Sequence, residues 1–255
     1  MSAYEAIIGL NKPIAIQSRS YFAPPTLDGI VTYLKAARKG NSSPPGPDSL
    51  RKGLEIPIDL DGSTHPYYRA SAMWADEPRY LGVYGWVRSR DWLDPGYELT
   101  KEKSDTFRKT PHRGSGKYRQ WQQALLLLHT PRLRFWFCGD KDKVEDLLGD
   151  LTHIGVRRAA GFGRVSFVLI RKSADYSVFD HNNNPARPVP ILEVSNPKNN
   201  WSRDYTRSTP PYWFPEDRTM CFVPPPYRWL TQSKQPPFLE TEEDEDREGD
   251  SSENN

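Results

Sequence analysis

The sequence predicts an α+β fold in which an antiparallel sheet is covered on one face by two helices. Residues 3–10 alternate in a strand pattern, two later stretches repeat apolar residues at helical spacing, and short apolar runs follow each of these stretches. The resulting order is strand, helix, strand, strand, helix, strand. This order is that of the ferredoxin-like (βαββαβ, RRM-like) plan, here with a large insertion after the first helix.

The first helix is predicted to begin after Thr26, which is a favourable N-cap residue. Asp28 lies in the first turn, where the helix dipole favours an acid. Arg38, Lys39 and Gly40 supply cations and a stop signal at the other end. The apolar stripe follows the i, i+3, i+4, i+7 rule: Leu27, Ile30, Val31 and Leu34.

Residues 40–121 read as a thumb-like insertion between the first helix and the second strand. The region begins with a Ser/Pro/Gly-rich stretch whose composition is that of a loop. We expect a Ser/Pro/Gly loop at residues 42–47 and a short helix at residues 48–54. Two strand-like pieces follow at residues 67–74 and 80–88, and a basic mobile segment lies at residues 101–116.

Regular patterning then returns, with strands predicted at residues 122–129 and 133–138. Asp140 is predicted to cap a second helix over residues 141–151, and a strand over residues 165–170 completes the sheet. The second helix carries its own apolar stripe: Val144, Leu147, Leu148 and Leu151. Residues 1–173 are therefore expected to form one domain.

The C-terminal part differs in composition from the rest. Residues 174–239 hold 12 of the 24 prolines together with 11 aromatic residues. Because disordered segments are poor in aromatic residues, we expect an irregular Pro/aromatic-rich extension that packs on the core or on a partner subunit. Residues 240–255 hold nine acids and one Arg, which predicts an acidic disordered tail. The chain's net charge of +2 therefore leaves +10 on the other residues, and a basic body attracts polyanions.

Several functional classes lack support in the sequence. There is no run of 18 apolar residues and no signal-like start, so we expect no membrane partner and a cytoplasmic protein. Cys138 and Cys221 form no metal-type pair and fit a reducing compartment, although a disulfide between them stays open. No zinc-type spacing occurs, and the calcium-like start at residues 59–62 has Ala70 where the twelfth-position Glu belongs. We expect no cofactor.

The strongest functional signal is the segment Gly-Val-Arg-Arg-Ala-Ala-Gly-Phe-Gly-Arg at residues 155–164, the glycine loop. Glycines allow positive φ and close approach to a ligand, exposed backbone N–H groups can form an anion-binding concavity, and arginines bind phosphate with a forked geometry. The alternative is a plain turn with a buried Phe162 and merely solvated arginines. The predicted RNA-binding residues here are Gly155, Arg157, Arg158, Gly161, Phe162, Gly163 and Arg164.

A second basic cluster spans residues 108–119. Flexible basic segments bind RNA backbones by counterion release, whereas the alternative is an exposed loop without a partner. Its RNA-binding candidates are Arg108, Lys109, His112, Arg113 and Lys117. Residues 114–117 lack the flanking Gly and Ser/Thr of an NTPase phosphate loop, since Pro111 and Tyr118 occupy those places. Metal-independent RNA cleavage by His112, Lys117 and Tyr118 remains an alternative.

Several stretches resemble the repeat-associated (RAMP) RNA-binding proteins of CRISPR systems. Residues 24–33 resemble that superfamily's entry to the first helix, residues 133–140 its strand before the second helix, and residues 154–165 its glycine loop. Residues 187–191 and 210–213 resemble the subunit of type IV effector complexes that binds the 5′ handle of the guide RNA. The similarity extends over residues 1–225 and is thin within the insertion.

The resemblance implies a non-catalytic RNA-binding subunit of a type IV effector ribonucleoprotein, with no catalytic residue. Such subunits hold the 5′ handle of the guide RNA (crRNA) and cap one end of the backbone filament, and a thumb in the insertion meets the neighbouring subunit. The implied partners are guide RNA, the backbone subunit and the large or cap subunit, with target DNA near its protospacer-adjacent motif in some relatives. Two other functions stay open: a guide-processing endoribonuclease, and a protein adaptor that uses the C-terminal extension.

Overall fold

The computed structural model describes residues 2–17, 24–38, 55–88, 121–210, 212 and 218–224. Five predicted features lie outside the described residues, and the first is the Ser/Pro/Gly loop at residues 42–47. The other four are the short helix at residues 48–54, the basic segment at residues 101–116, the second basic cluster at residues 108–119 and the acidic tail at residues 240–255.

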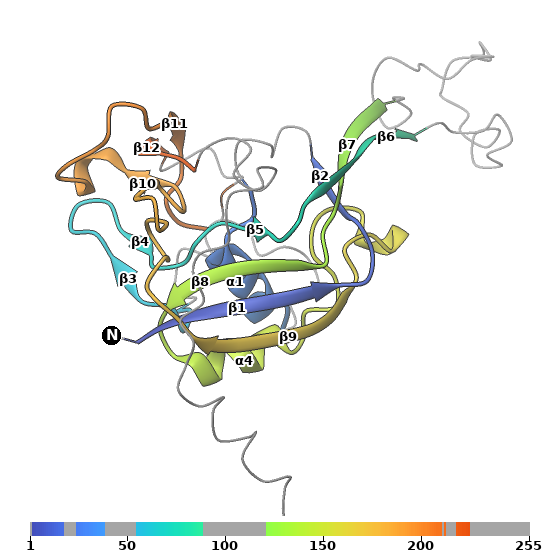
Figure 1. The fold of residues 1–255 in the computed structure, drawn as a ribbon, viewed down its shortest axis with the longest axis horizontal. Coiled ribbons are helices and arrows are strands. Elements are labelled where there is room, and N and C mark those ends of the chain that lie inside the picture. The colour runs from blue at the N-terminus through green and yellow to red at the C-terminus, as the bar shows by residue number, and fades with distance from the viewer. Residues whose placement is uncertain are drawn as a thin grey trace, which may run out of the picture.

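A four-stranded antiparallel sheet forms the centre of the molecule, in the order β5-β8-β1-β9 (Figure 1). The strands are β5 (Trp74–Ala75), β8 (Arg132–Cys138), β1 (Ala3–Leu10) and β9 (Val165–Lys172). In β1 the alternate residues Ala6, Ile8 and Leu10 are buried in the core, as their period-2 pattern predicts. The protein is therefore a mixed α and β structure with antiparallel sheets.

Two helices, α1 (Leu27–Arg38) and α4 (Lys141–Leu148), pack together against one face of this sheet (Figure 1). Asp140 caps α4 as predicted, because its carboxylate accepts a hydrogen bond from the Lys143 amide at 3.2 Å. The helix ends at Leu148 rather than at residue 151, but Leu151 is still buried with the rest of the predicted stripe.

The predicted strand at residues 122–129 exists as β7 (Trp121–His129), but its expected place in the central sheet is wrong. It pairs with β2 (Ile14–Gln17) and β6 (Arg79–Arg88) in a separate sheet of order β2-β7-β6. The β6–β7 hairpin extends away from the central sheet (Figure 1). The short strand β5 pairs with β8 instead. An apolar strand pattern predicts burial, but it does not say which sheet provides that burial.

The C-terminal extension is more regular than its composition predicts. Its strands β10 (Val189–Pro190), β12 (Thr219–Phe222) and β11 (Arg203–Thr206) form a small antiparallel sheet in that order. A short 3₁₀ helix, η4 (Ile191–Glu193), follows β10, and a hairpin of β3 (Leu60–Asp61) and β4 (Tyr67–Tyr68) lies beside the extension (Figure 1).

Arg187 ties this extension to the central core. Its side chain is fully buried, and its guanidinium donates hydrogen bonds to the Asp28 carboxylate at 3.3 Å and to the Tyr212 hydroxyl at 3.0 Å. It also donates to the backbone carbonyls of Tyr68, Ala70 and Ser208. A buried charge is tolerated only when it is paired in this way. Asp28 was expected to interact favourably with the dipole of the first helix, and the structure shows that it also pairs with a buried arginine.

A second buried arginine lies on the sheet face opposite the helices. Arg134 donates to Glu5 at 3.0 Å and to Asp76 at 2.9 Å, and all three side chains are buried. Trp136, on the same strand and face, packs edge-on against Tyr176 of the extension, with ring centroids 5.9 Å apart. The β8 half of this face is therefore covered.

Both cysteines are free and buried, so no disulfide joins Cys138 and Cys221. Burial raises the pKa of the Cys221 thiol to about 12. Within the described part of the chain, no helix is both long enough and apolar enough to cross a membrane.

Candidate nucleic-acid interface

The glycine loop connects α4 to β9 at the end of the central sheet where β1 finishes and β9 begins (Figure 1). Its base is fixed by the connection between β1 and β2. The Val156 amide donates to the Ala15 carbonyl at 2.9 Å, and the Gly163 amide donates to the Pro13 carbonyl at 2.8 Å. Backbone hydrogen bonds to β2 and to the residue before it thus hold both sides of the loop in place.

Two glycines are required where the loop meets its neighbours. Gly155 and Gly163 have φ of +91° and +64°, in the region that favours glycine. A Cβ on Gly155 would lie 2.7 Å from the Ala15 carbonyl oxygen, and one on Gly163 would overlap the Ile154 carbonyl. Both neighbours are backbone atoms. The close backbone approach at these two glycines is to the protein's own chain, and the predicted approach to a ligand stays a prediction.

The tip of the loop is a 3₁₀ turn, η3 (Arg158–Ala160), whose three residues are exposed. The amides of Ala160 and Gly161 donate within this turn, to the carbonyls of Arg157 and Arg158. These two amides are therefore already hydrogen-bonded, and the cationic side chain of the tip is Arg158.

The loop cations are arranged in different ways. Arg158 is exposed and lies over the ring of Tyr33 on α1, with its guanidinium carbon 4.6 Å from the ring centroid, and it donates to the Tyr33 hydroxyl at 3.0 Å. Arg164 is exposed, whereas Arg157 and Phe162 are half-buried. The partial burial of Phe162 fits a plain turn as well as a ligand-binding loop.

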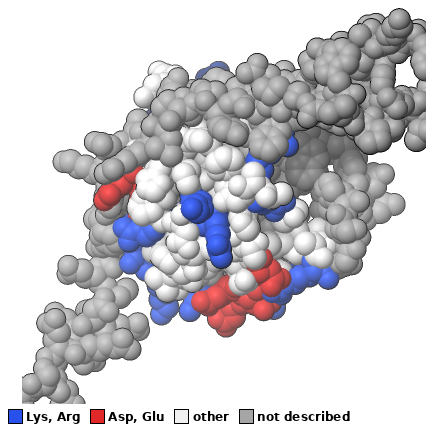
Figure 2. Space-filling view, turned by 90° about the vertical axis from the view of Figure 1, so that its right-hand side faces the viewer, with Lys and Arg blue, Asp and Glu red and all other residues white. Residues whose placement is uncertain are grey.

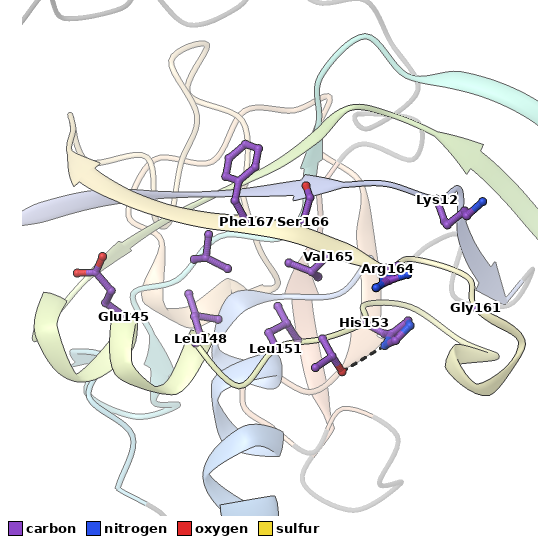
Figure 3. Close-up of a pocket in the computed structure, with 13 residues that line it drawn as sticks. Lys12, Glu145, Leu148, Leu151, His153, Gly161, Arg164, Val165, Ser166 and Phe167 are labelled. Atoms are coloured by element: carbon purple, nitrogen blue, oxygen red, sulfur yellow. Dashed lines mark hydrogen bonds between the residues drawn. The ribbon is translucent and has the colours of Figure 1, made fainter.

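A groove of about 720 Å³ runs from the glycine loop along β9 to α4 (Figure 3). Lys12, His153 and Arg164 lie together at the loop end, and Glu145 lies at the other end (Figure 3). The floor between them is apolar, with Leu148 among its residues. The groove therefore offers positive charge at the loop and negative charge at α4.

Figure 2 shows this end of the molecule. Lys and Arg side chains lie in the middle of the face and around it, whereas Asp and Glu form a large group at its lower edge and a smaller one at its upper left (Figure 2). Two exposed acids at the end of α4, Asp146 and Asp150, pair with Arg38, whose pKa rises through these hydrogen bonds. The acids on this side are thus partly neutralised by α1.

The structure brings all seven predicted residues of the glycine loop to one end of the sheet. Arg108, Lys109, His112, Arg113 and Lys117 lie outside the described residues. His129 is an exposed residue of β7, and His153 contacts the Thr152 hydroxyl at 3.2 Å in the groove. Within the described ranges, His, Cys, Asp and Glu do not form any group of three that could hold a metal ion.

Sequence reasoning missed Lys12 and Tyr33 as neighbours of the loop. Lys12 follows β1 in an exposed turn, and Tyr33 is an exposed residue of α1, 41% accessible. The available signal for Lys12 was a polar residue after a strand. The available signal for Tyr33 was an aromatic residue outside the apolar stripe of the helix. Neither signal identifies the loop that each residue approaches.

The model of the family described as CRISPR type IV associated protein Csf3 matches residues 93–224, which is more than half of the chain. The chain belongs to this family. The matched segment contains β7, β8, α4, the whole glycine loop and β9. No curated protein matches the chain.

Proposed function

We propose that the protein is a non-catalytic RNA-binding subunit of a type IV CRISPR effector complex, and that its glycine loop holds the 5′ handle of the guide RNA. Family membership supports the assignment to type IV CRISPR systems. The observation that carries the RNA-binding role is the loop itself: its base is fixed by backbone hydrogen bonds, Arg158 is exposed at its tip, and Arg164 is exposed where the loop meets β9.

The charges of the loop suit a sugar-phosphate backbone. Arginine presents several donors in a rigid fork and binds phosphate in a bidentate manner. Arg158 and Arg164 are exposed, and Lys12 adds a third cation at the same end of the groove. The acidic end at Glu145 repels phosphate, so we expect the RNA backbone to remain at the loop end.

We further propose that the central sheet and its two helices form a ferredoxin-like unit. The order β9-β1-β8-β5, antiparallel throughout, agrees with that plan if β5 counts as its second strand. The β6–β7 hairpin then projects from the connection between β5 and β8. We assign this hairpin as the thumb that contacts the neighbouring backbone subunit at the end of the filament, with target DNA as a further candidate partner.

The test is a triple variant, Arg157→Ala, Arg158→Ala and Arg164→Ala, in the reconstituted complex with guide RNA. We expect weaker RNA retention, and a slope of log affinity against log salt that is smaller by about 2, because each phosphate contact to single-stranded RNA contributes about 0.7. The matched control removes three exposed cations elsewhere: Lys143→Ala, Lys198→Ala and Arg218→Ala. Equal RNA affinity and salt slope in the two variants would contradict the proposal.

The non-catalytic part of the proposal has a separate test. Repeat RNA incubated with the protein in EDTA is expected to stay intact. Site-specific cleavage that disappears in His112→Ala would instead support the endoribonuclease alternative.

A further inference from the structure

A β-bulge in the central sheet changes the direction of two side chains next to the glycine loop. In the pairing of β1 with β9, Gly9 lies opposite Phe167 but Leu10 lies opposite Val165, so Ser166 is an extra residue. Bulges redirect side chains and often occur next to functional sites. Here the bulge turns both Ser166 and Phe167 toward Gly9.

Gly9 leaves the space that these two side chains occupy. A Cβ added at Gly9 would lie 2.5 Å from Cδ1 of Phe167 and 2.6 Å from Oγ of Ser166. The Phe167 ring therefore lies directly on the backbone of β1. We refer to Gly9, Ser166 and Phe167 together as the aromatic shelf.

The shelf is exposed although its largest member is apolar. Phe167 is 48% exposed and Leu169 is 49% exposed, on the sheet face opposite the helices. Val168 and Ile170 of the same strand pack on the core. The extension covers the β8 half of this face, but the β9 half, at the sheet edge, is accessible. Phe167 thus contributes little to the core and offers its ring to a ligand.

The surroundings of the shelf indicate the chemistry of that ligand. Lys12, Arg164, Ser166 and Phe167 all contribute to the groove, and the Phe167 ring projects on the other side of β9 from Leu148 and Leu151 (Figure 3). Arg164 precedes Phe167 by three residues, a span of at most about 11 Å of chain. Aromatic rings next to cations bind single-stranded nucleic acids, because a base stacks on the ring while the cations hold the phosphates.

We propose that Phe167 stacks on an unpaired nucleobase of the RNA strand whose backbone the glycine loop holds. This proposal rests on the proposed function and adds to it a residue that binds a base. The exposed ring lies beside Lys12 and Arg164, and a ring next to cations is the arrangement that binds single-stranded nucleic acid, so we take a base as the occupant of the shelf. The Ser166 hydroxyl can donate to or accept from the base edge or the ribose 2′-hydroxyl.

The test places 2-aminopurine at each position of the 5′ handle in turn, in the reconstituted complex. We expect strong fluorescence quenching at one position in the unaltered protein. Phe167→Leu should relieve this quenching and weaken RNA binding about 5- to 150-fold, the range typical of one stacked base. Phe167→Tyr keeps the ring and should behave like the unaltered protein. Gly9→Ala should give a similar loss, because it displaces the ring.

The outcomes separate the shelf from the loop. If Phe167→Leu keeps both the quenching and the affinity while the loop triple variant loses RNA, the shelf proposal is overturned and the proposed function stands. If neither variant affects RNA, both proposals are overturned. If Phe167→Leu instead releases a protein subunit and keeps the RNA, the shelf is a protein contact and the proposal is overturned. An unchanged melting temperature for Phe167→Leu shows that the fold is intact.

Discussion

The molecule uses arginine in two different settings. Arg134 and Arg187 are almost completely buried, and each is surrounded by carboxylates or carbonyls of its own chain. Arg158 and Arg164 are exposed at the end of the sheet. The buried guanidiniums have their donors committed to the fold, whereas the exposed ones can bind a ligand without breaking any buried pair. The comparison teaches that the number of arginines says little about RNA binding, but their burial and partners say much.

The largest expected effect is on stability and concerns the buried pair of Arg187 and Asp28. Arg187→Met leaves Asp28 buried without its cation, which should lower the free energy of unfolding by about 3–5 kcal/mol. Urea denaturation of the purified protein measures this loss. The double variant Arg187→Met with Asp28→Asn should recover part of it, because the uncompensated charge is gone. A loss below about 1 kcal/mol in the single variant would show that the buried pair is not needed.

The next effect tests whether the loop needs its fixed base. Gly163→Ala forces a Cβ onto the Ile154 carbonyl at positive φ, so it should cost about 2 kcal/mol or more and reduce RNA binding. Gly161→Ala is the matched control. Its φ is also positive, but a Cβ there meets nothing within 4 Å, so we expect a cost of only about 1–2 kcal/mol and normal RNA binding. Thermal unfolding and RNA affinity measure both variants, and the same loss of RNA in both would argue against a fixed base.

A smaller effect is expected from the contact between Tyr33 and the exposed Arg158. Tyr33 orients Arg158 through its ring and hydroxyl, and a cation–π contact at an exposed site contributes about 0.5–1 kcal/mol. Tyr33→Leu should therefore weaken RNA binding by a few-fold and leave stability almost unchanged. Tyr33→Phe keeps the ring and should show a smaller loss. Affinity titrations at fixed salt compare the two, and an undiminished affinity in Tyr33→Leu would mean that Arg158 needs no support.

The smallest effect concerns an anion held by backbone amides rather than by arginine. The Glu193 carboxylate accepts from the amides of Ser63, Thr64 and His65 at 2.8–2.9 Å, and these hydrogen bonds lower its pKa to about 2. Because the pKa is lower in the folded protein, the stabilisation is present above pH 4.5, the ordinary value, and is lost as the pH falls toward 2.

Hydrogen exchange of the three amides measures this contact. We expect their protection to fall between pH 4.5 and 2 in the unaltered protein, after correction for the intrinsic exchange rate. Glu193→Gln should show weaker protection that is independent of pH in this range. Constant protection in the unaltered protein would contradict the assignment.

Much of the fold could be predicted because it depends on local pattern. The stripe of α1, the Asp140 cap of α4 and the alternation in β1 each carry their own signal, and all three are present. The partner of β7 could not be predicted, since pairing depends on contacts between distant segments. The Arg187–Asp28 pair was hidden for the same reason, because 159 positions separate its two members.

The candidate site was predictable in part. Glycines and arginines within ten residues indicated the loop, and its positive φ angles agree with that signal. Phe167 was hidden because the bulge at Ser166 breaks the alternation of β9, so the strand pattern alone does not show where its ring points. Lys12 was hidden because its nearness to the loop follows from the β1–β9 pairing.

Photocrosslinking of the assembled complex tests the central claim most directly. Guide RNA with 4-thiouridine at successive positions of its 5′ handle is irradiated in the complex, and the crosslinked peptides are identified by mass spectrometry. The account predicts crosslinks to residues 155–167 of this chain, and their loss in the arginine triple variant. Crosslinks from every handle position to other subunits alone, with none to residues 155–167, would contradict it.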